Sequence, residues 1–217
     1  MERTVTIQGT GRVTAAPDLI ELPLSLNALE PDYEAAAAQS AAQLDALRAA
    51  LEPLGFAEAD LPTVSYQVTT EYESVPDEHG VYRSRFVGYR CSHELKLAFD
   101  LDMEHLSAVL SALSACSAKP QFIIRFTVRD PDAVYDALLR SAAENARAKA
   151  EVLCAASGAK LGKLLHIRYG RNEAEVCSRT NVMFACDEAA PRAKGIALRP
   201  DDIRLSDTAT FIWAIEH

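Results

Sequence analysis

The chain has 217 residues, of which 49% are hydrophobic and 24% charged, the composition of an ordinary globular protein that can bury a substantial core. Its formal net charge of −9 argues against nucleic-acid binding and against docking on an acidic membrane surface, because no run of lysines or arginines is available to neutralise phosphates. No segment approaches the roughly 18 consecutive apolar residues of a transmembrane helix, so membrane insertion is not expected.

Cysteine usage and the start of the chain bear on the cellular compartment. Thr4 to Ile7 alternate as a strand does, whereas an export signal would show a charged region followed by an apolar one. The five cysteines are an odd number without a Cys-x-x-Cys spacing, which gives no support for a complete disulfide framework or a zinc site. We therefore expect a reduced, cytoplasmic protein, or a periplasmic or otherwise exported one if a leader has been removed.

The first elements in chain order are two strands and a helix. Residues 5–15 alternate as a strand and contain Gly9-Thr10-Gly11, where the glycines favour a bulge or a close backbone approach. After a turn at Ala16-Pro17-Asp18, residues 20–28 form a second strand that is expected to run antiparallel to the first. Residues 31–54 form an alanine-rich helix, and its apolar stripe predicts packing against a sheet rather than a coiled-coil seam.

The middle of the chain reads as a hairpin, a short helix and another strand. Residues 64–72 and 87–99 alternate as strands, and the polar segment 74–84 between them predicts a hairpin. Asp102 is the expected cap of a short helix with apolar positions at Leu106, Val109, Leu110 and Leu113. Residues 122–128 alternate again and lead directly into the next helix.

A long amphipathic helix is predicted from Pro131 to Ser157. Asp130 suits the N-cap, Pro131 the first helical position, and the first breaker afterwards is Gly158. Spacings of four and three residues predict a buried face made of Val134, Leu138, Ser141, Asn145, Ala148, Val152 and Ala155. On that face Asn145 is expected to bond the backbone or a neighbouring strand end, as a structural pin rather than a catalytic amide.

After the long helix, residues 165–169 and 203–215 are predicted strands, and 171–200 is a loop-like segment without clear periodicity. The resulting order ββαββαβαββ predicts an α+β fold in which antiparallel sheet packs against three helices. We expect a single domain over 1–217, or two intimately packed halves of about 1–100 and 101–217.

Two patterns could carry acid–base or metal chemistry. Asp100-x-Asp102-x-x-His105 places carboxylates near an imidazole, but a solvated helix start explains it better, since Asp102 is the expected cap. His93 and Glu94 point to opposite faces of a strand and form no dyad. His93 falls on the apolar side, where a hydrogen-bonded, half-buried histidine is expected rather than a base.

Other chemical signals are fewer. Gly9-x-Gly11 lacks the third glycine and following helix that a nucleotide needs, and no catalytic or metal-binding motif appears, so no catalytic, cofactor or metal residue is predicted. Cys177 and Cys186 are the redox candidates, as a thiol pair or a regulatory disulfide. Their simpler explanation is free surface thiols, because only an approach of Arg171, Arg179 or Arg192 would lower their pKa.

Several short segments in this order resemble a known family. They are Ile7-Gln8-Gly9-Thr10-Gly11, Ala16-Pro17-Asp18, the helix ending at Gly55, Gly88-Tyr89, the run Asn145 to Glu151, Gly158, and Leu161-Gly162. Together they span nearly the whole chain, which resembles the SIMPL-domain family of bacterial oxidative-stress-associated and 26 kDa periplasmic antigen-like proteins. The resemblance implies an α+β fold and assembly into rings or larger oligomers, and it implies no catalytic residue and no cofactor.

Two functional hypotheses remain open from the sequence. The preferred one is a non-enzymatic, self-assembling binding or scaffold protein with a stress-related role, in which association buries sheet edges that a monomer leaves open. The alternative is a thiol-redox or small-ligand protein that uses Cys177, Cys186 or a pocket between sheet and helices. Besides copies of itself, an unknown protein or small molecule is the expected partner.

Overall fold

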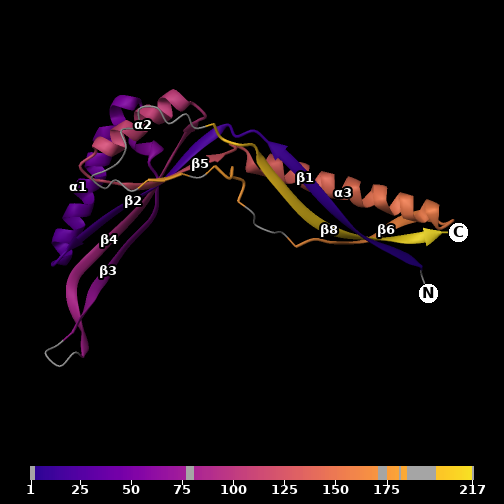
Figure 1. The fold of residues 1–217 in the computed structure, drawn as a ribbon, viewed down its shortest axis with the longest axis horizontal. Helices are drawn as coiled ribbons and strands as arrows, with labels where there is room; N and C mark the ends of the chain where they lie inside the picture. Colours follow the sequence, from indigo (N-terminus) through magenta and orange to yellow (C-terminus); the bar gives the residue numbers. More distant parts are fainter. Residues whose placement is uncertain (1–2, 77–80, 171–174, 181, 185–198, 217) are drawn as a thin grey trace. The chain divides into compact units, whose positions relative to one another are not determined.

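The computed structural model describes residues 3–76, 81–170, 175–180, 182–184 and 199–216, and within them the chain forms three α-helices and eight strands (Figure 1). The strands are β1 (Thr4–Ala15), β2 (Leu19–Glu30), β3 (Thr63–Pro76), β4 (Tyr82–Asp100), β5 (Gln121–Thr127), β6 (Lys160–Arg168), β7 (Val182–Phe184) and β8 (Ile203–Glu216). The helices are α1 (Tyr33–Leu51), α2 (Met103–Ala115) and α3 (Pro131–Ala156), with the 3-10 turns η1 (Glu52–Leu54) and η2 (Glu58–Asp60). This confirms the predicted α+β fold, with β7 added to the predicted order.

The chain divides into two compact units. The first comprises Met1–Asp18, Thr127–Arg179 and Pro200–His217, and the second comprises Leu19–Phe126 and Thr180–Arg199. Each unit has its own sheet, with strand order β1-β8-β6 in the first and β3-β4-β2-β5-β7 in the second. The units therefore interleave along the chain and do not follow a boundary near residue 100.

In the first unit, α3 lies along one face of the three-stranded sheet (Figure 1). β8 is the central strand and pairs antiparallel with both β1 and β6. The contact is close because β1 has glycines where the helix crosses it: a Cβ on Gly9 would lie 2.1 Å from the Ala142 carbonyl oxygen, and one on Gly11 equally close to that of Leu138. The predicted close backbone approach at these glycines is confirmed.

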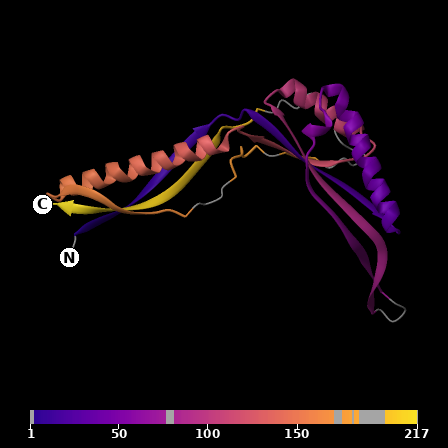
Figure 2. The same cartoon turned by 180° about the vertical axis from the view of Figure 1, so that it is seen from behind.

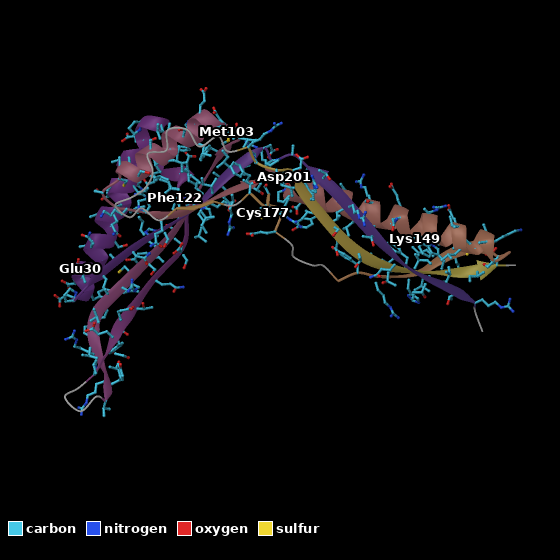
Figure 3. All side chains as sticks on the ribbon, viewed as in Figure 1. Glu30, Met103, Phe122, Lys149, Cys177 and Asp201 are labelled. Carbon is cyan, nitrogen blue, oxygen red and sulfur yellow. The ribbon has the colours of Figure 1, made fainter. Side chains whose placement is uncertain are left out.

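Side chains of α3 also complete the outer edge of β1, which has no neighbour on that side among the described strands. The Thr10 amide donates to Asn145 Oδ1 over 3.0 Å, the Arg12 amide donates to Ser141 Oγ over 3.1 Å, and Lys149, labelled in Figure 3, donates to the Gln8 carbonyl over 3.2 Å. Four helical residues rise about 6 Å and two strand residues about 6.8 Å, so the two series stay in register over this length. The predicted structural role of Asn145 is confirmed.

Replacing Asn145 with alanine is expected to cost about 0.5–1.5 kcal/mol, because the Thr10 amide loses its acceptor at a half-buried site. Hydrogen exchange measured by NMR should show faster exchange at Thr10 than in the wild type. Glu144→Ala, at an exposed position on the same helix, is the matched control and should leave that amide unchanged. Equal protection of Thr10 in both variants would contradict the role given to Asn145.

The predicted buried face of α3 was wrong in part. Asp130 caps the helix as expected, through its side chain and the Ala133 amide, but Val152 is 68% exposed. Leu138 is buried as predicted, and the other buried residues are Ala142, Ala146, Ala150 and Cys154. Their strict four-residue spacing follows β1, and alanine's small side chain permits the close approach, whereas the prediction alternated spacings of four and three residues.

The second unit has α1 and α2 over one face of its sheet (Figure 2). Alternate residues of β2 and β4 point into a core that the two helices close, made largely of Ile20, Leu22, Leu24, Leu26, Leu47, Leu51, Leu95, Leu97, Leu106, Leu113, Ile124 and Phe126. α1 ends at Leu51 and continues as η1 before Gly55, and its predicted packing against the sheet is confirmed.

Two expectations on strand pairing are corrected by the structure. β2 does not pair with β1 but lies between β4 and β5. The turn at Ala16-Pro17-Asp18 therefore connects two different sheets and does not close a hairpin. Asp18 is held there by its amide on the Thr127 carbonyl and by its carboxylate, which accepts from the Arg129 amide. The loop-like segment 171–200 contains β7, which pairs with β5, while most of its other residues lie outside the described ranges.

Candidate functional site

The β3–β4 hairpin extends beyond the rest of its sheet. Glu30, the last residue of β2, is opposite Tyr89, so no third strand of the described structure lies beside the part of the hairpin from Tyr82 to Gly88. Both views show it continuing past the end of α1 that begins at Tyr33 (Figures 1 and 2). We call this part, Glu71–Pro76 with Tyr82–Gly88, the ribbon. A two-stranded ribbon alone is only marginally stable in water.

Gly88 marks the point where β2 leaves the hairpin. A Cβ at this position would lie 2.3 Å from the carbonyl oxygen of Glu30, which is labelled in Figure 3, and 3.2 Å from the Cα of Pro31. The chain therefore passes directly over β4 on its way from β2 into α1, and only glycine leaves room for it. The fold thus requires glycine at position 88, the first residue of the Gly88-Tyr89 segment.

Four aromatic rings form a continuous row at the base of the ribbon. Phe86 contacts Tyr72 at 5.6 Å and Tyr89 at 5.4 Å between ring centroids, and Tyr89 contacts Tyr33 at 5.8 Å, all edge to face. Tyr33 and Tyr72 are each 55% exposed and Phe86 is 44% exposed. We call Tyr33, Tyr72, Phe86 and Tyr89 the aromatic row. An exposed apolar group of this size is typical of a protein–protein contact.

Strand β3 is also the edge of its sheet, with β4 as its only hydrogen-bonded neighbour among the described strands. The charges of its two glutamates are neutralised by arginines of β4. Glu71 accepts from Arg90 Nε at 2.9 Å, and Glu73 pairs with Arg85. The bond from Arg90 holds the pKa of Glu71 below its ordinary value, so this pair stays ionised. Between the bulges at Thr63/Ser65 and Glu71/Tyr72 the strand is regular and lacks lysine and proline, the residues that commonly block edge pairing.

His93 lies in a small polar cluster between β3, β4 and α1. The ring is 7% exposed, its Nε2 is 2.8 Å from Thr63 Oγ1, and Tyr66 packs against it edge to face at 5.1 Å. The Tyr66 hydroxyl donates to the sulfur of the fully buried Cys91 over 3.7 Å. The prediction of a hydrogen-bonded structural histidine is confirmed, and burial keeps the thiol of Cys91 away from a substrate.

His93 should make the protein less stable in mild acid. Burial, and then the charge of Arg48, lower the pKa of His93 below its ordinary value of 6.5, and the charge of Glu94 acts in the opposite sense. The unfolded chain therefore binds the proton more readily than the folded one, so this stability is complete above pH 6.5 and is lost as the pH falls below it. An NMR titration should give a midpoint for His93 below 6.5, and a midpoint above that value would contradict its burial.

A pocket of about 350 Å³ opens between α1 and the η1–η2 turns. Arg48, Glu52, Phe56, Glu58 and Leu61 line it, among other residues. Arg48 already forms an ion pair with Glu58 at 2.6 Å, which partly neutralises its charge. From the sequence we expected a pocket between sheet and helices. This pocket lies instead beside α1.

Comparison with known families matches residues 5–213 to the model of a family described as SIMPL, protein of unknown function (DUF541). The chain belongs to the SIMPL family. The match includes all or most of every strand and helix described above, so both units are part of the family's fold. The resemblance seen in Gly9-Thr10-Gly11, Gly88-Tyr89 and the run from Asn145 is thereby confirmed.

Two curated relatives of this SIMPL chain are the 26 kDa periplasmic immunogenic proteins of Brucella melitensis and Brucella abortus. Each is 26% identical over 164 residues, which is 75% of this chain and 65% of the relative. The match thus spans about two thirds of the length of these relatives. No helix in the described part of the chain is long and apolar enough to cross a membrane.

Of the two predicted redox cysteines of this SIMPL chain, Cys177 lies within the described residues. Cys177, labelled in Figure 3, is half-buried beside Thr127, and the next residue, Ser178, donates to the carbonyl of Asp201 over 2.8 Å. Cys186 lies outside the described residues. Among the described cysteines, Cys91, Cys116 and Cys154 are buried thiols.

The acid–base candidates serve the fold in the described structure. The side chain of Asp102 accepts from the amides of Glu104 and His105, which makes it the N-cap of α2 as expected, and the His105 ring packs against Phe56 and Phe99. No group of three or more potential ligand side chains is placed to hold a metal ion within the described ranges. The aromatic row was not predicted as a site, although Tyr72 and Phe86 flank the polar loop of an expected hairpin.

Proposed function

We propose that this SIMPL chain is a non-enzymatic, self-assembling binding or scaffold protein, in which copies associate through strand β3 and the aromatic row. The observation that carries the proposal is the ribbon, which projects beyond its sheet with exposed rings at its base. A second copy would supply both a strand for the β3 edge and apolar cover for the rings.

The charge pattern of β3 suits pairing between identical strands. In a two-fold antiparallel pair each strand meets its own sequence reversed, so unneutralised like charges would be brought together. Glu71 and Glu73 are already paired with Arg90 and Arg85, and the remaining residues of β3 carry no charge. Main-chain hydrogen bonds would then set the register, and the rings of the aromatic row would add buried apolar area.

Lysines on the edge strand should prevent assembly. The double variant Gln67→Lys, Thr69→Lys changes two exposed residues in the regular part of β3, and like charges would face each other across a strand pair. We expect its mass, measured by light scattering, to fall to that of smaller species at a concentration where the wild type is associated. A variant mass equal to that of the wild type would contradict assembly through β3.

The matched control adds the same charge elsewhere. Ala148→Lys, Ala155→Lys places two lysines at exposed positions of α3, away from β3, and should assemble as the wild type does. A separate variant, Tyr72→Ser, Phe86→Ser, removes two rings of the aromatic row without adding charge, and is also expected to weaken association. Loss of assembly in the α3 control as well would show that net charge, and not the β3 edge, is responsible.

The alternative function is a thiol-redox or small-ligand protein. The half-buried position of Cys177 and the pocket beside Arg48 support it, although the charge of Arg48 in that pocket is partly neutralised by Glu58. A change in oligomeric mass that needs an oxidant and that Cys177→Ser abolishes would favour this alternative over the β3 edge.

The compartment and a stress-related role belong to the same proposal. The sequence pattern predicts a cytoplasmic protein, whereas the Brucella relatives are named periplasmic proteins. Assembly through β3 needs neither a disulfide nor a cofactor, so it would operate in either compartment. Fractionation of the producing cells decides between the two locations.

A further inference from the structure

The face of the first unit's sheet that lies opposite α3 has an unusual composition. In β1 and β8 the odd-numbered residues Ile7, Ala209, Phe211 and Trp213 pack on the α3 side, so the even-numbered ones point away from the helix. These are Thr4, Thr6, Gln8, Thr10, Arg12 and Thr14 of β1, and Arg204, Ser206, Thr208, Thr210, Ile212 and Ala214 of β8. His166 and Arg168 of β6 pair with Ile212 and Thr210 and join the same face. We call these residues the open face.

The open face gathers positive charge in a protein whose net charge is −9. Arg12, Arg168 and Arg204 are exposed, and no ion pair within the described residues involves them. By contrast, the guanidinium groups of Arg48, Arg85, Arg90 and Arg147 are each paired with a glutamate. The carboxylate of Glu216 lies at the far end of the strand, opposite Lys160. The positive charge of the open face is thus complementary to an anionic ligand.

The register spaces these arginines along an extended line. Arg12 is opposite Ser206 and Arg204 is opposite Thr14, which makes the two arginines diagonal neighbours about 7–8 Å apart or slightly less. Arg168 is opposite Thr210 on the other side of β8, roughly 17 Å from Arg12 by strand spacing and rise. Hydroxyl groups of Thr208, Thr210 and Ser206 fill the surface between them.

We propose that the open face binds an acidic polysaccharide of the uronate type. A guanidinium group takes a carboxylate through two parallel hydrogen bonds, and threonine and serine hydroxyls both donate to and accept from sugar hydroxyls. A flat, extended surface fits an extended polymer. A nucleic acid fits less well, because the open face has no Phe, Tyr or Trp ring on which bases stack, and three arginines neutralise few phosphates.

The test measures binding of alginate, a carboxylated polysaccharide, to the full chain at an ionic strength of about 0.15 M, where charges more than about 8 Å from the bound polymer are largely screened. Neutral dextran and a thymidine oligonucleotide are the comparisons. We expect alginate to bind, dextran not to bind, and the triple variant Arg12→Gln, Arg168→Gln, Arg204→Gln to bind alginate about tenfold or more weakly. No binding of alginate, or tighter binding of the oligonucleotide, would overturn the proposal.

The control separates the open face from net charge. Arg140→Gln, Arg147→Gln, Arg179→Gln removes the same charge from exposed positions elsewhere in the first unit and should leave the affinity for alginate within about twofold of the wild type, since exposed charges that make no contact are screened by salt. An equal loss in both triple variants would overturn the assignment of the site. All three proteins are compared at the same oligomeric mass, so that a failure of assembly through β3 is recognised separately.

The hydroxyl groups have a test of their own. Thr6→Val, Thr14→Val, Thr208→Val keeps the β-branched shape and all charges of the open face but removes three exposed hydroxyls. We expect alginate to bind this variant severalfold more weakly than the wild type, because sugar hydroxyls lose partners. Undiminished binding would overturn the recognition of sugar by these threonines.

Discussion

Gly9→Ala is expected to destabilise the first unit by about 3 kcal/mol or more. The added Cβ would lie 2.1 Å from the Ala142 carbonyl oxygen and 2.7 Å from the Ala146 Cβ, and these atoms belong to a long helix that cannot yield locally. α3 would have to move away from β1. That movement would also break the bonds from Asn145 and Lys149 to the edge of β1.

Trp213 is the single tryptophan of the chain and is buried in the cluster between α3 and the sheet, so its fluorescence reports unfolding of the first unit in urea. Gly170→Ala is the matched control, because a Cβ there meets no atom within 4 Å, and its unfolding midpoint should equal that of the wild type. A Gly9→Ala protein that loses less than about 0.5 kcal/mol would mean that α3 does not press on β1 as described.

Leu138→Ala should cost about 2–5 kcal/mol by the same measurement, because Leu138 is 3% exposed on the face of α3 that lies against the sheet. The cost combines the lost burial of the side chain with the cavity that it leaves. The neighbouring Leu139 is 36% exposed and makes the matched control, for which Leu139→Ala should cost less than about 1 kcal/mol. Equal losses in the two variants would place the buried face of α3 elsewhere.

Much of the fold could be predicted from the sequence because its signals are local. Strand alternation, the caps Asp102 and Asp130, and the glycines Gly9 and Gly11 each depend on neighbours close in the chain or on the absence of a side chain. The same local patterns predicted that Asn145 bonds the backbone or a strand end, and it accepts from the Thr10 amide. These features follow from backbone geometry, which a sequence expresses directly.

The errors concern partners that are distant in the sequence. β1 pairs with β8 at the other end of the chain, and nothing near Pro17 distinguishes a hairpin turn from a connection between two sheets. The buried face of α3 was misjudged because alanine stripes such as Ala142 and Ala146 carry little hydrophobic signal. In this fold small size, rather than hydrophobicity, decides what faces β1.

The candidate surfaces were harder still to predict. Arg12, Arg168 and Arg204 belong to three strands, so their common face appears only once the order β1-β8-β6 is known. The ribbon depends likewise on where β2 ends relative to β4. Composition alone, with its net charge of −9, pointed away from any anion-binding face.

Absolute mass in solution, measured by light scattering across a dilution series with and without reductant, tests the central claim most directly. Assembly through β3 predicts a defined oligomer whose mass is the same in both conditions, because main-chain pairing and apolar contacts need no disulfide. A monomer at micromolar concentration, or an oligomer that forms only without reductant, would contradict it.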